Sequence, residues 1–441
     1  MIKYSYFILI SSISLFLHQT SVAQSGQNPD TRLAGQCIQD LTEVLVHDIT
    51  SPPVASRDYV YPMIAFFEAM RPADSSYPSF AGRLNGLQPI PAFTSGQTYD
   101  WVLAGVTAFY TTANAFVFSK DLFRQAWDSV DKLLKQRPIP EPVYDRSIQY
   151  GQLVAAHILK WSREDHYIHM RTMPRFTPGK HPGDWQQTGP DYMEAIEPHW
   201  DQLRPMVLEK AHQFVIPEPV EFNSPAYLKE VHEVYDVSQH LTKEQENAAR
   251  FWDCNPFATQ TIGHLMYSVK KVSPGGHWIG ITNMAIGQKR QGPVAALYAY
   301  SMVSVAIFEA ILSAWDEKYR SNYIRPITAI QQTFAPTWQP ILQTPPFPEY
   351  PSGHSVISMS AATVLTALYG DHFNYVDSVE KEYGLPERPF SSFIDAANEA
   401  AISRMYGGIH FTEAIVNGKL LGKWIGEVVL QKCGPVHAFT Q

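Results

Sequence analysis

Three short segments near the end of this 441-residue chain carry side chains that could act together on an anion. The segment KYRSNYIRP contains Lys318 and Arg325, and PSGH spans residues 351–354. The third segment, SRMYGGIH, contains Arg404 and His410. Arginine binds an oxyanion through two parallel hydrogen bonds, and lysine binds it as a compact point charge. The three cations therefore suit a tetrahedral or trigonal oxyanion.

The PSGH segment is predicted to open a helix. Ser352 and Gly353 lie at its start, where free backbone N–H groups and the helix dipole attract negative charge. Because Gly353 has no side chain, an anion can approach its N–H closely. His354 follows one residue into the helix. It is thereby predicted to lie beside the bound anion.

The last segment contains a helix-breaking pair, Gly407 and Gly408, between its arginine and its histidine. A turn at this pair would bring Arg404 and His410 to the same point in space. Each segment alone is common: such cations usually form a solvated face, and a lone histidine is usually a surface or core residue. The ordered combination Lys-x6-Arg-Pro, Pro-Ser-Gly-His and Ser-Arg-x5-His is far rarer, and it predicts an oxyanion site.

This combination resembles the superfamily shared by type 2 phosphatidic acid phosphatases, bacterial acid phosphatases and vanadium-dependent haloperoxidases. All defining residues match, over roughly residues 315–411, whereas the N-terminal half has no comparably specific motif. The resemblance implies that Lys318, Arg325 and Arg404 neutralise the oxygens of bound vanadate or phosphate. Ser352 and the Gly353 N–H would complete the cradle.

The resemblance also implies separate roles for the two histidines. His410 would bind vanadium as a nitrogen ligand, or would attack phosphorus as a nucleophile. His354 would be the general acid–base on the opposite face, with Lys318 assisting catalysis by polarising the peroxide. A cationic cluster disfavours a protonated imidazole, so His354 is suited to accept a proton at neutral pH.

Residues around the motifs favour the haloperoxidases. PPFPEYPSGH resembles their second motif, and Phe347 falls where they place a residue beside the halide. Trp315 resembles an indole found in these enzymes, although a core aromatic is an equal alternative. Asp253, in FWDCNP, lies where the family can hold a carboxylate that pairs with the third-motif arginine (here Arg404). An exposed aspartate near a helix end is the alternative interpretation.

The implied function is a vanadate-dependent haloperoxidase that oxidises a halide, iodide or bromide, with hydrogen peroxide. Vanadate would act as a Lewis acid without changing its oxidation state. Phosphate would compete for the same site. The alternative is a secreted acid phosphatase acting through a phosphohistidine at His410. A silent anion-binding protein is a third possibility, which the intact His354 and His410 disfavour.

The elements that position these residues are predicted to be helices. Residues 242–245 have capping-box spacing and start a helix that runs toward Trp252. Ser352 can cap a helix that Gly370 closes, and strand-like alternation is scarce. We therefore predict an all-α fold of two packed helix bundles with the active site at the end of the C-terminal one. The halves would be residues 24–230 and 231–441, with one compact unit as the alternative.

Composition limits the partners and the location of the protein. A net charge of −8 predicts no general attraction to nucleic acid. Residues 1–23 resemble a cleavable signal peptide, which predicts a secreted or periplasmic protein that begins at Gln24. The apolar segment 293–316 could cross a bilayer, but its serines and tyrosines favour a buried helix and no stable membrane insertion.

The chain contains three cysteines, Cys37, Cys254 and Cys433. Their spacing does not match a metal-binding motif, and an odd count leaves at least one thiol unpaired within the chain. We therefore expect isolated buried or surface cysteines. The sequence leaves their disulfide state and the oligomeric state of the protein open.

Overall fold

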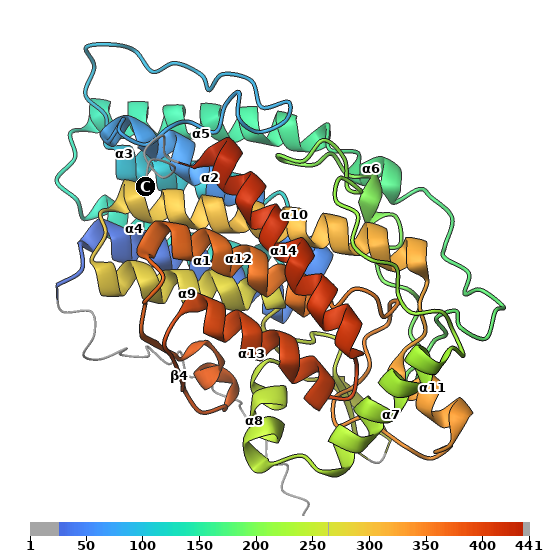
Figure 1. Cartoon of the computed structure of the whole chain (residues 1–441). Coiled ribbons are helices and arrows are strands. Elements are labelled where there is room, and N and C mark those ends of the chain that lie inside the picture. Colours follow the sequence, from blue (N-terminus) through green and yellow to red (C-terminus); the bar gives the residue numbers. More distant parts are fainter. Residues whose placement is uncertain (1–25, 263, 435–441) are drawn as a thin grey trace, which may run out of the picture.

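The computed structural model describes residues 26–262 and 264–434, which form fourteen α-helices and three short 3-10 helices (Figure 1). The predicted signal peptide, residues 1–23, lies outside the described residues. The α-helices are α1 (Pro29–His47), α2 (Pro52–Met70), α3 (Trp101–Ala113), α4 (Lys120–Lys135), α5 (Glu141–Arg163), α6 (Tyr167–Met170), α7 (Pro225–Gln239), α8 (Lys243–Phe251), α9 (Pro274–Lys289), α10 (Pro293–Ser321), α11 (Pro326–Thr333), α12 (Gly353–Tyr369), α13 (Phe393–Tyr406) and α14 (Thr412–Cys433).

The described β-strands form two small antiparallel pairs. Strand β1 (Thr259–Ile262) pairs with β2 (Leu265–Ser268), and β3 (Tyr375–Asp377) pairs with β4 (Arg388–Phe390). The 3-10 helices are η1 (Arg71–Ala73), η2 (Trp200–Gln202) and η3 (Val379–Tyr383). Helices form the whole framework, so the all-α prediction is confirmed.

Helix α10 runs through the centre of the molecule and packs against α2, α9, α12 and α14 (Figure 1). Such a helix is apolar on every side because no side faces water. Among the described residues, α10 alone is long and apolar enough to span a membrane, but 94% of its most apolar window is buried inside the protein. This matches the predicted buried helix.

The one charged residue in the apolar part of α10, Glu309, is fully buried and receives backbone hydrogen bonds. The N–H groups of Val207 and Leu208 donate to its Oε1. Burial raises the pKa of Glu309 to about 7. These hydrogen bonds therefore hold the loop before α7 against the central helix α10. Because the site is buried, the charged form of the carboxyl group is disfavoured.

One contiguous apolar core includes residues from α1 through to α14, and a small second cluster consists of Ala249, Leu342 and Ile409. The main core joins the two predicted halves, since α2 from the first half packs on α10 from the second. The predicted boundary near residue 230 stays a prediction.

Local caps set the helix ends that matter for the site. Thr242 and Gln245 form the predicted capping box of α8, which ends before Trp252. The Ser352 hydroxyl accepts the Ser355 N–H at 3.4 Å and starts α12, and α12 stops before Gly370, whose φ is 99°. Both predicted helices are confirmed.

Close packing on α14 holds the start of α12 in place. A Cβ on Gly422 would meet the Val356 carbonyl oxygen at 2.3 Å, and one on Gly418 would meet the Ser352 oxygen at 3.0 Å. Only glycine allows this approach. The Ser352 N–H donates to the Ala414 carbonyl at 3.0 Å. The first turn of α12 is thus fixed against α14.

Candidate active site

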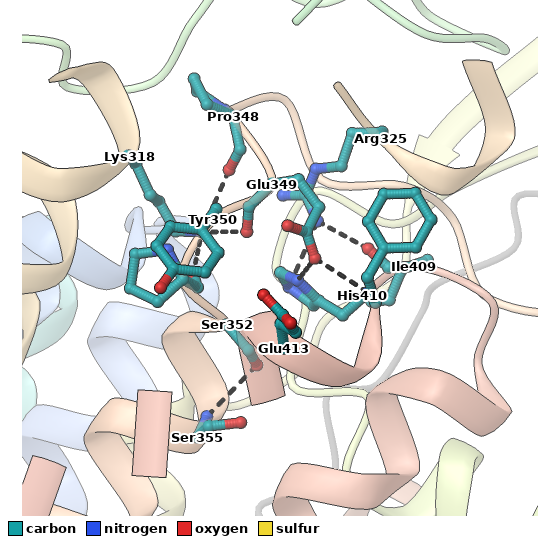
Figure 2. A network of polar contacts seen from close by, with 12 residues as sticks. Lys318, Arg325, Pro348, Glu349, Tyr350, Ser352, Ser355, Ile409, His410 and Glu413 are labelled. Atoms are coloured by element: carbon teal, nitrogen blue, oxygen red, sulfur yellow. Dashed lines mark hydrogen bonds and ion pairs between the residues drawn. The ribbon is translucent and has the colours of Figure 1, made fainter. Parts of the chain in front are cut away.

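Residues from each of the three predicted segments, namely Lys318, Arg325, Ser352 and His410, lie close together (Figure 2). Lys318 lies in the last turn of α10, and Arg325 caps α11. His354 lies in the first turn of α12, Arg404 in the last turn of α13, and His410 just before α14. Gly408, with φ of 75°, makes the turn that separates Arg404 from His410. The fold therefore brings together residues that are up to 92 positions apart in the sequence (318 to 410).

Lys318 is fully buried and donates to three backbone carbonyls. Its Nζ lies 3.0 Å from the Pro348 oxygen and 2.9 Å from the Glu349 oxygen, and it also bonds the Pro351 oxygen (Figure 2). Burial, followed by the charge of Arg325, lowers the pKa of Lys318. These carbonyls all belong to the segment before α12, so Lys318 orders that segment as well as supplying charge.

Arg325 is buried with its guanidinium turned toward His410. Its Nη1 donates to the Ile409 carbonyl at 2.9 Å and lies 3.2 Å from His410 Nε2, while its Nε donates to the Phe347 carbonyl at 2.9 Å. Burial lowers its pKa to about 10. Arg325 is therefore a fixed cation directly beside the predicted ligand nitrogen.

Arg404 is also buried, and hydrogen bonds to Ser403 and Ala249 fix its guanidinium group. Its Nε and Nη2 donate to Ser403 Oγ at 3.0 and 2.9 Å, and Nη2 also donates to the Ala249 carbonyl at 3.1 Å. Burial lowers its pKa. Ser403, the first residue of the third motif, thus orients the arginine that follows it.

Trp315 and Phe347 form an aromatic wall next to these cations. Their ring centroids are 5.0 Å apart, and the Phe347 ring lies 5.1 Å from Lys318 Nζ and 5.0 Å from Arg325 Cζ. A Cβ on Gly353 would lie 3.7 Å from Trp315 and 3.8 Å from Lys318. Phe347 thus contacts the charged residues of the site, and Trp315 packs against Phe347.

His410 is buried, and its two ring nitrogens have different surroundings. Nδ1 lies 2.7 Å from Glu349 Oε1, which also accepts the Phe411 N–H at 3.0 Å (Figure 2). Burial and Arg325 lower the pKa of His410, which favours the neutral ring. With its proton on Nδ1 and donated to Glu349, the ring presents the Nε2 lone pair to the cation cluster.

Glu349 is a functional residue that the sequence analysis missed. It lies in PPFPEYPSGH, the segment that contains the second motif. The feature of the sequence that could have revealed it is a charged residue within an apolar, proline-rich run. Its side chain is fully buried, and burial raises its pKa to about 8. Its partner His410, just before α14, is 61 residues away, so no local spacing reveals the contact.

His354 and His410 line one pocket. The pocket wall is otherwise largely apolar and includes Trp315, Phe347 and Cys254. Burial, followed by the charge of Arg404, lowers the pKa of His354, so its neutral form is favoured. His354 Nε2 is buried and has no hydrogen-bond partner among the described residues.

The structure corrects the predicted partner of Asp253. This carboxylate forms its ion pair with Lys271, whereas the Arg404 guanidinium turns toward Ser403 and Ala249. Asp253 is still close enough for its charge to favour protonated Arg404. It is buried, so the alternative of an exposed aspartate is also wrong.

Comparison with known proteins decides the family. A family model described as the VCPO second helical-bundle domain matches residues 298–435, which contain all three motifs. The crystal structure of a bacterial vanadium-dependent iodoperoxidase matches with a TM-score of 0.85 and 44% identity, covering 91% of this chain and 96% of that one. The chain belongs to the vanadium-dependent haloperoxidases.

A more distant structural neighbour of this haloperoxidase shares its fold. The holo form of a bacterial vanadium-dependent chloroperoxidase matches with a TM-score of 0.64 at 17% identity, over 94% of this chain and 96% of that one. An undecaprenyl-diphosphatase from Sulfolobus acidocaldarius is 24% identical over 184 residues, which are 41% of this chain and 76% of that protein. The phosphatase relationship is therefore distant, and the haloperoxidase prediction is confirmed.

The residues of this haloperoxidase fit its vanadate cofactor. Besides His354 Nε2, the buried Arg325 Nη2 has no hydrogen-bond partner within the described part of the chain. A buried donor without a partner costs about 1–3 kcal/mol, and an oxyanion would satisfy it. His410 Nε2 offers one nitrogen ligand, and Lys318, Arg325 and Arg404 supply compensating positive charge.

Proposed function

We propose that this haloperoxidase oxidises iodide with hydrogen peroxide, using vanadate held by His410 and by the cations around it. The observation that carries the choice of halide is its 44% identity, over nearly the whole chain, to a bacterial vanadium-dependent iodoperoxidase. Iodide is also the halide that requires the least oxidising power.

The pocket in front of the two histidines supports iodide. Its wall includes the aromatic rings of Trp315, Phe347 and Phe257 and the aliphatic side chains of Ile357 and Ile409. Moving an ion from water into such surroundings costs less for a large ion, because the Born energy falls with radius. Iodide is larger and more weakly hydrated than bromide or chloride, so this wall favours it.

Bound vanadate supplies a Lewis acid that makes hydrogen peroxide susceptible to attack by a halide. The protein contributes charge, orientation and proton transfer. Arg325, Arg404 and Lys318 balance negative charge, and Glu349 keeps the His410 Nε2 lone pair directed into the site. His354 Nε2, which is neutral and unpaired, takes a proton from hydrogen peroxide and returns it to the departing water oxygen. Overall, peroxide, iodide and one proton give hypoiodous acid and water.

The direct test is peroxide-dependent iodide oxidation by purified apo-protein, with and without added vanadate, beside a phosphatase assay. Activity should appear only with vanadate and should be lost in His410→Ala together with tight vanadium uptake. Stoichiometric vanadium retention by His410→Ala would contradict the ligand assignment. Phosphatase turnover without any iodide oxidation would favour the alternative enzyme, a secreted acid phosphatase.

We further propose that the protein is exported and loses residues 1–23. The basis is the sequence alone: Lys3, the apolar run at residues 6–17 and the small residues ending at Ala23. Intact mass of the protein secreted from its native host should correspond to a chain that begins at Gln24. A mass that includes residues 1–23 would contradict export by cleavage.

A further inference from the structure

A second group of ligand-type side chains lies fully buried beside the active site. Cys254 follows α8, His277 lies in the first turns of α9, and Glu380 belongs to η3. Cys254 Sγ lies 3.4 Å from His277 Nδ1 and 3.6 Å from Glu380 Oε1, and the latter two atoms are 3.1 Å apart. A sulfur, a nitrogen and an oxygen thus converge from three separate segments. Cys254 is free and buried, as expected, and it has these two polar neighbours.

These three separations match the edges of one face of a metal coordination tetrahedron. Zinc binds thiolate sulfur at about 2.3 Å, imidazole nitrogen at about 2.0–2.1 Å and carboxylate oxygen at about 2.0–2.2 Å. Tetrahedral angles then place the ligand atoms roughly 3.3–3.6 Å from one another. The observed 3.1, 3.4 and 3.6 Å agree with that range to within about 0.2 Å.

The hydrogen bond at the outer nitrogen of His277, Nε2, fixes the orientation of the ring for ligation through Nδ1. His277 Nε2 lies 2.8 Å from Asp377 Oδ2, and Asp377 Oδ1 accepts the Val379 N–H at 3.0 Å. A metal-binding histidine typically donates its other N–H to a carboxylate, which fixes the tautomer and strengthens the ligand. With Nε2–H donated to Asp377, the Nδ1 lone pair of His277 faces Cys254 and Glu380.

We propose that Cys254, His277 and Glu380 bind one divalent cation of the zinc class, with Asp377 orienting His277. The mixed sulfur, nitrogen and oxygen donors select a borderline metal over magnesium or calcium, which prefer oxygen alone. The site uses none of the residues of the vanadate cradle and does not depend on the proposed halide chemistry.

The zinc-class ion would stabilise one wall of the active-site pocket. The Trp252 ring stacks on His277 with 4.6 Å between centroids, and the Trp252 backbone is hydrogen-bonded by His354. Cys254 itself lines the pocket. Ligation at Cys254 would therefore anchor the segment 252–254, which orients His354. The role is structural support, and no reaction step passes through this metal.

The competing interpretation is a metal-free hydrogen-bond network, in which a protonated His277 bridges Asp377 and Glu380. Both interpretations satisfy the same atoms, but they differ in metal content. We would measure zinc and vanadium per chain by mass spectrometry after reconstitution with both and extensive dialysis. The proposal requires about one zinc per chain in the wild-type protein, and absence of retained zinc would establish the metal-free network.

Variants separate this site from other thiols and from the cofactor site. Cys254→Ser should lose the zinc, whereas Cys433→Ser, which removes another buried thiol, should keep it. His410→Ala should lose vanadium and keep zinc, so failure of the proposed function can be distinguished from failure of this site. Zinc content of Cys254→Ser equal to that of the wild type would overturn the ligand set.

Cobalt substitution of the wild-type protein keeps the test valid if Cys254→Ser does not fold. A cobalt ion bound by a thiolate has an intense near-ultraviolet charge-transfer band that oxygen and nitrogen ligands do not produce. This band should appear with one equivalent of cobalt and should disappear on addition of zinc. Cobalt binding without the band would exclude Cys254 as a ligand and would refute the proposal.

Discussion

Replacing Glu349 with alanine should weaken vanadate binding by about tenfold to a hundredfold, the usual effect of removing a residue that hydrogen-bonds a metal ligand. Glu349 Oε1 accepts from both His410 Nδ1, at 2.7 Å, and the Phe411 N–H, at 3.0 Å. In Glu349→Ala both donors lose their acceptor in a buried site. An unsatisfied buried donor costs about 1–3 kcal/mol, and tenfold to a hundredfold corresponds to about 1.4–2.8 kcal/mol.

The loss should arise from the tautomer of His410. Without an acceptor at Nδ1, the ring proton is no longer held there, and a proton on Nε2 removes the lone pair that vanadium requires. Glu349→Gln is the matched control because its amide oxygen can still accept both hydrogen bonds. We expect its affinity to stay within a few-fold of the wild type.

The assay is equilibrium dialysis of each apo-protein against vanadate, with bound vanadium measured directly and folding checked by circular dichroism and thermal melting. The reasoning requires the order wild type, then Glu349→Gln, then a clear gap to Glu349→Ala. If the alanine variant folds normally and binds vanadate as tightly as the glutamine variant, the acceptor role of Glu349 is refuted.

Three further predictions concern His354, the cations of the vanadate cradle and Glu309 in the central helix α10. His354→Ala should retain vanadate, but its turnover per bound vanadium should fall about a hundredfold to ten-thousandfold. Unimpaired turnover would refute the acid–base role of His354. Phosphate should inhibit reconstitution competitively with vanadate, because Lys318, Arg325 and Arg404 suit both anions, and non-competitive inhibition in the kinetics would indicate two sites. Burial raises the pKa of Glu309 to about 7, above the value near 4.5 of an exposed carboxyl, so its contribution to stability is present below pH 4.5 and is lost as pH rises through 7. This pH-dependent loss of stability is about 3 kcal/mol, and it should be absent in Glu309→Gln. Melting temperatures of both proteins measured between pH 4 and 8 test this. The same change of melting temperature with pH in the two proteins would contradict the prediction.

The parts that could be predicted from sequence rest on local signals. Thr242 with Gln245, Ser352 and Gly370 set helix ends through contacts within one turn, so the helices α8 and α12 were predictable. Motif residues such as Arg404 were predictable because their order along the chain matches a known family. Their convergence depends on helix packing that no single segment encodes.

The remaining contacts could not be predicted because their partners come from distant segments. Asp253 pairs with Lys271 across a β-hairpin, and nothing in FWDCNP distinguishes that partner from Arg404. Cys254 and Glu380 are 126 residues apart and have no motif spacing. Such pairs become visible only when the fold brings the segments together.

The burial of Lys318, Arg325 and Arg404 in one place has a consequence for the folding of the whole protein. Like charges that are desolvated together repel, and burial lowers the pKa of each of the three. The native state therefore carries an electrostatic penalty that the unfolded chain, with these cations spread through water, does not. An anion that binds only the native state offsets this penalty and adds its own binding free energy to the stability of the fold. We therefore expect the melting temperature of this protein to rise with the concentration of an oxyanion that binds the site, so that part of its stability comes from the ligand.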